Sequence, residues 1–241
     1  MRSLRVAFGL LTTLPAWRDD DWAPGQIGRA AVWFPFVGLL IGAVVWGVWA
    51  GLGWLLPPAV AGILALAAWI ALTGGLHLDG LADCCDGLLA SAAPERRLEI
   101  MRDPRLGVFG AVGLMLVLLL KAASLAALTP AAGGGILLAT SLARWCVLPA
   151  GLLPRARPEG LGAEYASGLR PWSLAVGALI PLALMIALGW RAVAAAVLGL
   201  VAAGLALLFA RRRIGGVTGD VFGFMIELVE TTMLVALLIR I

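Results

Sequence analysis

An uninterrupted apolar run, GVFGAVGLMLVLLLKAASLAAL, occupies residues 107–128 and contains a single charged side chain, Lys121. An α-helix rises about 1.5 Å per residue, so about 20 apolar residues are enough to cross the hydrocarbon core of a bilayer. A run of this length with one charge is typical of a helix that spans a membrane. Residues 107–128 therefore predict at least one transmembrane helix.

Six other stretches have the same character. Hydrophobic residues make up 62% of the 241 residues and charged residues 13%, whereas a soluble domain is about 45–50% apolar and about 25% charged. This composition excludes an ordinary soluble enzyme and a disordered chain. It predicts an all-α integral membrane protein, a polytopic bundle of about seven transmembrane helices that forms a single domain over residues 1–241. The seven predicted spans are Val32–Leu56, Ala59–Leu76, Gly107–Leu128, Gly133–Leu153, Trp172–Trp190, Ala192–Ala210 and Val221–Ile239.

The basic residues predict the orientation of this bundle. If the N-terminus is cytoplasmic, the outer loops contain only Arg191 and Arg240, and the positive-inside rule favours the N-terminus inside and the C-terminus outside. The same rule explains the net charge of +4, so we expect no nucleic-acid partner. Residues Met1–Trp17 have a charged start and a short apolar run but no small-residue cleavage site. They predict an N-terminal amphipathic segment rather than a signal peptide.

The acidic residues gather in two motifs at the predicted cytoplasmic face. The first, TGGLHLDGLADCCDG at residues 73–87, contains Asp79, Asp83 and Asp86. Their spacing places all three on one stripe of a helix, and such carboxylates repel one another unless cations neutralise them. Oxygen ligands suit a hard ion, Mg²⁺ or alternatively Mn²⁺, rather than Zn²⁺. The competing interpretation, a solvated acidic helix face, does not explain why the aspartates lie among apolar residues at a membrane boundary.

The second motif, GGVTGDVFGFMIELVE, covers residues 215–230 and places Asp220, Glu227 and Glu230 on one helix face. The preceding residues, among them Gly216, Thr218 and Gly219, predict a turn whose free backbone N–H groups bind phosphate at a helix start. Glutamates in an apolar span are costly without partners, and the candidate partners are Lys121 and Arg144. The alternative is a glycine-rich turn followed by a helix with a structural ion pair.

Basic residues between the two motifs supply further candidates. Arg102 and Arg105 lie just before the apolar run that begins at Gly107, and guanidinium groups bind phosphate oxygens in fork geometry. A positive-inside loop is the alternative. His77 is the only histidine, and it is open to interpretation as a general base, a phosphate donor or a buried core residue. Taken together, the carboxylates, arginines and glycine-rich turn favour transfer of a phosphoryl-linked group.

These motifs resemble the adenosylcobinamide-GDP ribazoletransferase family, also called the cobalamin (cobalamin-5′-phosphate) synthases. The resemblance lies in residues 73–87, in LEIMRDPRLG at 98–107, in GGVTGD at 215–220 with Glu227 and Glu230, and in WFPFVG at 33–38. It implies a Mg²⁺-dependent enzyme of the bacterial cytoplasmic (inner) membrane with its active face in the cytoplasm. Such an enzyme joins adenosylcobinamide-GDP to α-ribazole, or to α-ribazole 5′-phosphate, and releases GMP. A homo-oligomer or a complex with other corrinoid enzymes stays open.

The resemblance also implies residue roles. The expected metal ligands are Asp79, Asp83, Asp86 and Asp220, and the expected catalytic residues are Asp83, His77, Glu227 and Glu230. Phosphate binding is expected from Arg102, Arg105, Gly216, Thr218 and Gly219. Two other functions remain alternatives: a phospholipid-forming enzyme similar to the CDP-alcohol phosphotransferases, suggested by Asp83, Asp86 and Gly87, and a cation transporter, suggested by charged residues within spans.

Overall fold

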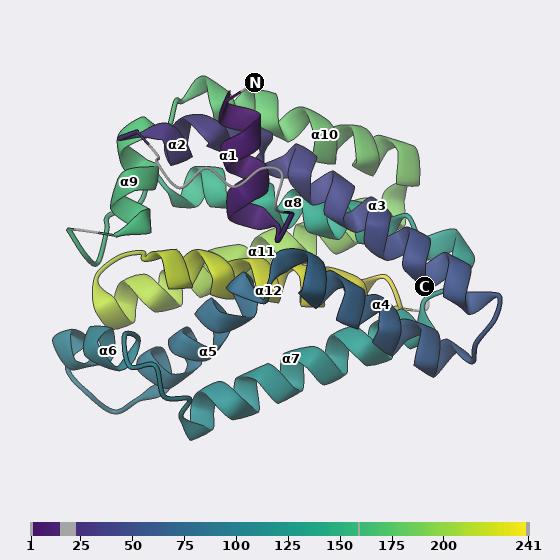
Figure 1. The fold of residues 1–241 in the computed structure, drawn as a ribbon, viewed down its shortest axis with the longest axis horizontal. Helices are drawn as coiled ribbons and strands as arrows, with labels where there is room; N and C mark the ends of the chain where they lie inside the picture. Colours follow the sequence, from purple (N-terminus) through teal and green to yellow (C-terminus); the bar gives the residue numbers. More distant parts are fainter. Residues whose placement is uncertain (1, 15–22, 159, 240–241) are drawn as a thin grey trace.

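The computed structural model describes residues 2–14, 23–158 and 160–239, and these residues form helices joined by short connections (Figure 1). Trp17 of the predicted amphipathic segment, as well as Arg240, lies outside the described residues. The helices are α1 (Arg2–Leu11), α2 (Gln26–Ala30), η2 (Ala31–Trp33), α3 (Phe34–Gly53), α4 (Pro58–Thr73), α5 (Leu76–Leu89), α6 (Pro94–Ile100), α7 (Val108–Ala127), η3 (Pro130–Ala132), α8 (Gly135–Ala150), α9 (Leu161–Gly168), α10 (Trp172–Leu188), α11 (Trp190–Ile214) and α12 (Gly219–Ala236).

Helix α12 forms the centre of the bundle. It packs against α5, α7, α8 and α11, and Figure 1 shows it running through the middle of the molecule. Buried residues lie around most of its circumference, including the consecutive residues Val221, Phe222 and Gly223. Helix α8 is similarly enclosed. The second acidic motif is therefore held in the core rather than on a lipid-facing surface.

The outer helices α7, α10 and α11 present large apolar side chains to their surroundings. Leu119 on α7, Ile186 on α10 and Leu205 on α11 are all more than half exposed. Exposed apolar patches of this extent suit a hydrocarbon environment, because water disfavours them. The arrangement, with a charged interior and an apolar exterior, confirms the predicted class of all-α membrane protein.

The first acidic motif begins at a sharp bend. Helix α4 ends at Thr73, and Gly74 and Gly75 then adopt left-handed conformations with φ of 64° and 70°. L-amino acids with a side chain rarely adopt this conformation, so the glycine pair ends one helix and starts the next. Helix α5 leaves at 92° to α4. The predicted span Ala59–Leu76 is wrong at its end, since Leu76 already belongs to α5.

The predicted number of seven spans is not confirmed. Four stretches of the described residues are long and apolar enough to cross a membrane, or five if the bent α4–α5 pair counts as one span. They are Gln26–Gly53, Val108–Ala127, Pro130–Ala150 and Trp190–Ile214. Helix α10 is apolar but shorter. Helix α12 is not among these four stretches, and it contains Asp220, Glu227 and Glu230.

Candidate active site

Helix α5 carries the first acidic motif as predicted, with all three aspartates on one helix. Asp79 is exposed, whereas Asp83 and Asp86 are half-buried. Two arginines fix the far end of this helix: Arg97 and Arg213 each donate a hydrogen bond of 2.7 Å to the carbonyl of Leu88. Cations at a helix C-terminus complement the partial negative charge of its free carbonyl groups. The aspartate stripe therefore has a firmly held scaffold.

Two glycines bring α5 and α12 into backbone contact. A Cβ atom on Gly80 would lie 2.7 Å from the carbonyl oxygen of Asp220, and one on Gly223 would lie 3.1 Å from the carbonyl oxygen of His77. Small residues at a helix crossing let two backbones approach in this way. As a result, Asp83 interacts electrostatically with Asp220 of α12 as well as with Asp79 of its own helix. The two acidic motifs thus converge, as the sequence predicted.

This crossing makes a specific prediction. Gly80→Ala should separate Asp220 from the α5 aspartates, because the added methyl group meets backbone atoms that cannot move independently. Displacing a reactive group by about 1 Å can cost on the order of 100-fold in rate, so we expect a loss of GMP release of at least about tenfold. Gly204→Ala is the matched control, since a Cβ there meets nothing within 4 Å. Equal activity of the two variants would contradict the role given to this crossing.

Asp220 is held by two neighbours at the start of α12. Arg157 donates a hydrogen bond of 3.3 Å to its Oδ2, and the Thr218 hydroxyl donates one of 3.2 Å to the same atom. Burial raises the pKa of Asp220, and the Arg157 charge opposes that shift. Because Asp220 is partly buried beside other carboxylates, a nearby cation would stabilise its ionised form.

Asp86 has a different structural environment from the other aspartates. Its carboxylate accepts hydrogen bonds of 2.8 Å from the backbone N–H groups of both Gly107 and Gly110. A Cβ atom on Gly107 would lie 2.4 Å from Asp86 Oδ1, so only glycine leaves room for this contact. A carboxylate is favourable at this position because the first N–H groups of α7 have no partner within the helix. Asp86 thus fixes the start of α7, while its predicted role as a metal ligand stays a prediction.

The donor set fits a hard divalent cation. Asp79, Asp83 and Asp220 offer carboxylate oxygens from two helices, and Arg157 interacts electrostatically with both Asp83 and Asp220. Oxygen ligands of this kind suit Mg²⁺ or Mn²⁺. Within residues 2–14, 23–158 and 160–239, no three His, Cys, Asp or Glu side chains already stand in ligating positions.

Arg157 is the arginine of this site, and sequence reasoning did not select it. It follows α8 in a connection whose backbone pairs with the second motif: the N–H of Val217 donates to the carbonyl of Pro154, and the N–H of Ala156 donates to the carbonyl of Val217. The guanidinium also donates a hydrogen bond of 2.9 Å to the carbonyl of Leu98. Its place in a basic loop between two predicted spans was the only available signal.

Arg157→Gln should reduce turnover about tenfold or more. The substitution removes both hydrogen bonds that hold Asp220 and the α6 segment, and hydrogen bonds to charged groups typically contribute about 1.5–3 kcal/mol. Steady-state GMP release measures the effect. Arg155→Gln is the control, because the Arg155 side chain is exposed. If both variants retain wild-type turnover, Arg157 has no part in the site.

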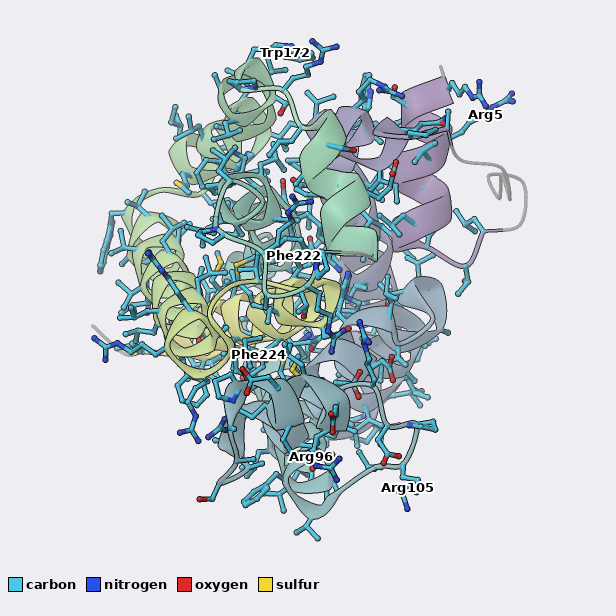
Figure 2. The ribbon with its side chains drawn as sticks, turned by 90° about the vertical axis from the view of Figure 1, so that its left-hand side faces the viewer. Arg5, Arg96, Arg105, Trp172, Phe222 and Phe224 are labelled. Atoms are coloured by element: carbon cyan, nitrogen blue, oxygen red, sulfur yellow. The ribbon has the colours of Figure 1, made fainter. Side chains whose placement is uncertain are left out.

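The two arginines that the sequence favoured lie elsewhere. Arg105 donates hydrogen bonds of 2.9 and 2.6 Å to both carboxylate oxygens of Asp103, and these bonds hold the pKa of Asp103 well below its usual range. Figure 2 shows Arg105 at the margin of the molecule, whereas Phe222, two residues after Asp220, lies near the centre. Arg102 is exposed on the same connection. Phosphate binding by Arg102 and Arg105 stays a prediction.

In the glycine-rich turn, Gly216 packs closely against the backbone of residues 154–156. A Cβ atom on Gly216 would lie 2.3 Å from the carbonyl oxygen of Pro154, so this glycine permits the close pairing with residues 154–156. Thr218 caps α12, and its hydroxyl accepts a hydrogen bond from the N–H of Val221. Gly219 and Asp220 line a cavity. Phosphate binding by Gly216, Thr218 and Gly219 stays a prediction.

A buried ion-pair network occupies the middle of the bundle. Lys121 of α7 donates hydrogen bonds of 2.7 Å to Glu227 and 2.5 Å to Glu230. Arg144 of α8 forms an ion pair with Glu230 and contacts the His77 Nδ1 at 3.4 Å. Two buried cations and two buried anions therefore balance one another. The catalytic roles predicted for His77, Glu227 and Glu230 stay predictions, and the glutamates' ion pairs favour the structural alternative.

A cavity of about 130 Å³ opens beside the converging aspartates. Asp79, His77 and Asp220 line it together with apolar side chains from α1, α2, α3, α8, α9 and α12. The acidic residues thus lie next to a largely apolar, partly open cavity. This combination of a few polar groups with an apolar cavity is typical of small-molecule sites.

Comparison with known proteins places the chain among membrane enzymes of corrinoid assembly. A family model described as cobalamin-5-phosphate synthase matches residues 3–238. The chain belongs to this family. Curated relatives named adenosylcobinamide-GDP ribazoletransferase include proteins from Pseudomonas paraeruginosa, 42% identical over 98% of both chains, and Deinococcus radiodurans, 39% identical over 97% of this chain and 84% of the relative. No solved structure matches the chain.

Membership of the cobalamin-5-phosphate synthase family confirms the resemblance that the motifs predicted. The family match covers both acidic motifs and the helices between them. A Roseiflexus relative of the same name is 38% identical over 96% of this chain. The site at which α5 and α12 converge therefore lies in a chain of the cobalamin-5-phosphate synthase family.

Proposed function

We propose that this protein transfers the adenosylcobinamide-phosphate group of adenosylcobinamide-GDP to α-ribazole or its 5′-phosphate. The names of the relatives support this activity. The observation that carries it in this chain is the meeting of Asp79 and Asp83 with Asp220 beside a cavity. The products are adenosylcobalamin, or its 5′-phosphate, and GMP.

The reaction needs one displacement at phosphorus. The oxygen of a ribose hydroxyl on the ribazole forms a bond to the phosphorus that carries the cobinamide arm. The bond from that phosphorus to the oxygen of the GMP group breaks, and the hydroxyl proton is released. Such a reaction depends chiefly on positioning and on stabilisation of negative charge.

Asp79, Asp83 and Asp220 would hold the divalent cation, with Mg²⁺ as the expected ion and Mn²⁺ as the alternative. When bound, the cation would neutralise charge on the transferred phosphoryl group and on the departing oxygen. Arg157 would keep Asp220 in place while its positive charge limits repulsion among the carboxylates. Asp86 would act indirectly by fixing α7 against α5.

The proposed location is the bacterial inner membrane, with the site at the cytoplasmic face. Arg97 of α6 and Arg213 in the last turn of α11 both donate to the carbonyl of Leu88 near the end of α5, and Arg211 and Arg212 lie in the same turn as Arg213. Arginine and lysine are enriched in cytoplasmic connections of membrane proteins. The charged end of the bundle therefore faces the cytoplasm in this proposal.

Purified protein in detergent provides the test. We expect release of GMP when adenosylcobinamide-GDP, α-ribazole and Mg²⁺ are all present, and loss of release when a chelator removes the cation. CMP release from a CDP-alcohol would instead support the phospholipid enzyme. Uptake of a divalent cation into proteoliposomes without GMP release would support the transporter. Either of these results, without GMP release, would overturn the proposed function.

A further inference from the structure

The cavity beside Asp79 and Asp220 has a rigid aromatic wall. Phe34 and Tyr165 stack with ring centroids 6.0 Å apart, and Tyr165 meets Phe222 edge-on at 5.5 Å. The Tyr165 hydroxyl donates a hydrogen bond to the carbonyl of Val147, so its polar end is satisfied by the protein. The three rings therefore offer the cavity apolar surface. Aromatic rings prefer such stacked and edge-on neighbours.

His77 gives this cavity a defined polar group. Its Nδ1 faces the Arg144 guanidinium, which can only donate hydrogen bonds. Nδ1 is therefore the acceptor, and the proton of the neutral ring lies on Nε2. Among the residues that the structure describes, Nε2 has no protein partner, so this N–H is available as a donor.

We propose that this cavity binds the planar heterocyclic base of the ribazole, with the Nε2–H of His77 donating to the unprotonated ring nitrogen of that base. The inference rests on the proposed function, because it assigns a place to one of its substrates. With the base in the cavity, the ribose lies at the mouth beside Asp79 and Asp220. The attacking hydroxyl is thereby directed toward the carboxylates.

Size and polarity exclude the other parts of the substrates from this cavity. A cavity of about 150 Å³ can hold a single benzene ring, so a space of about 130 Å³ can enclose at most one ring of a bicyclic base, with the rest of that base at the open mouth, and it is far too small for a corrin macrocycle. Guanine carries several donors and acceptors that an apolar lining would leave without partners, at a cost of about 1–3 kcal/mol each. Dimethylbenzimidazole exposes only one ring nitrogen and two methyl groups.

Filling the cavity tests this assignment. Val147→Phe introduces a ring into the lining, and Val197→Phe introduces the same ring on the exposed surface of α11. We expect Val147→Phe to raise the KM for α-ribazole about tenfold or more, as misfit of a few atoms does in hydrophobic pockets, and to leave the KM for adenosylcobinamide-GDP within about twofold. Val197→Phe should change neither. An unchanged KM for α-ribazole in a folded Val147→Phe protein would overturn the inference and leave the proposed function standing.

A second experiment measures binding of the riboside directly and does not depend on turnover. Calorimetric titration should show that α-ribazole binds more tightly than the corresponding indole riboside, which has a C–H group in place of the ring nitrogen. His77→Phe should remove this preference, whereas His77→Gln should retain part of it because the amide still donates. Equal binding of both ribosides by the wild type would exclude the hydrogen bond from His77. Selective binding without GMP release would support the base site even if the proposed function failed.

Discussion

Replacing Asp83 with asparagine should lower GMP release by about 100-fold or more while the protein stays folded. Asp83 is half-buried on α5 and interacts electrostatically with Asp79, Asp220 and Asp86. Asparagine has nearly the same shape but removes the charge that attracts a cation. Loss of one well-placed electrostatic group commonly costs on the order of 100- to 1,000-fold in rate.

The thermal stability of Asp83→Asn should not fall together with its activity. In the absence of Mg²⁺, Asp83→Asn reduces repulsion among the carboxylates, so the melting temperature in detergent should be equal to or higher than that of the wild type. Asp103→Asn is the control, because Asp103 is paired with Arg105 on an outer connection. Wild-type turnover by Asp83→Asn at saturating Mg²⁺ would remove Asp83 from the catalytic site.

Glu230→Gln should destabilise the protein by about 3–5 kcal/mol, which is the usual cost of breaking a buried ion pair. Glu230 is fully buried and forms ion pairs with both Lys121 and Arg144. The substitution leaves two buried cations facing only Glu227. Denaturant titration in mixed micelles measures the resulting loss.

A charge-balanced variant distinguishes charge from packing. Combining Glu230→Gln with Lys121→Met removes one anion and one cation, so we expect it to recover much of the lost stability. Arg96→Gln provides a surface comparison, because the exposed Arg96–Glu99 pair should contribute less than about 1 kcal/mol. If Glu230→Gln is as stable as Arg96→Gln, the network does not support the bundle.

Sequence periodicity was sufficient to predict the parts of the site that lie within single helices. The 3.6-residue repeat places Asp79, Asp83 and Asp86 on one stripe, and α5 has that arrangement. Apolar length likewise predicted the membrane class. The bend between α4 and α5 was missed, although Gly74-Gly75 was its signal, because an apolar run by itself does not show where a helix changes direction.

Contacts between distant segments could not be predicted in the same way. The carboxylate of Asp86 accepts hydrogen bonds from the N–H groups of Gly107 and Gly110, an environment that spacing along α5 does not predict. Arg157 reaches Asp220 and Leu98 across the fold. Lys121 and Arg144 were candidate partners for the glutamates, but only the packing of α7 and α8 against α12 determines the pairing. These features depend on tertiary proximity rather than on local spacing.

Binding of Mn²⁺, followed by electron paramagnetic resonance, tests most directly whether α5 and α12 together form a cation site. The wild type should bind Mn²⁺ saturably, and Mg²⁺ should compete. Asp83→Asn on α5 and Asp220→Asn on α12 should each weaken binding by about tenfold or more, whereas Asp103→Asn should bind as the wild type does. Wild-type affinity in both Asp83→Asn and Asp220→Asn would contradict a shared site.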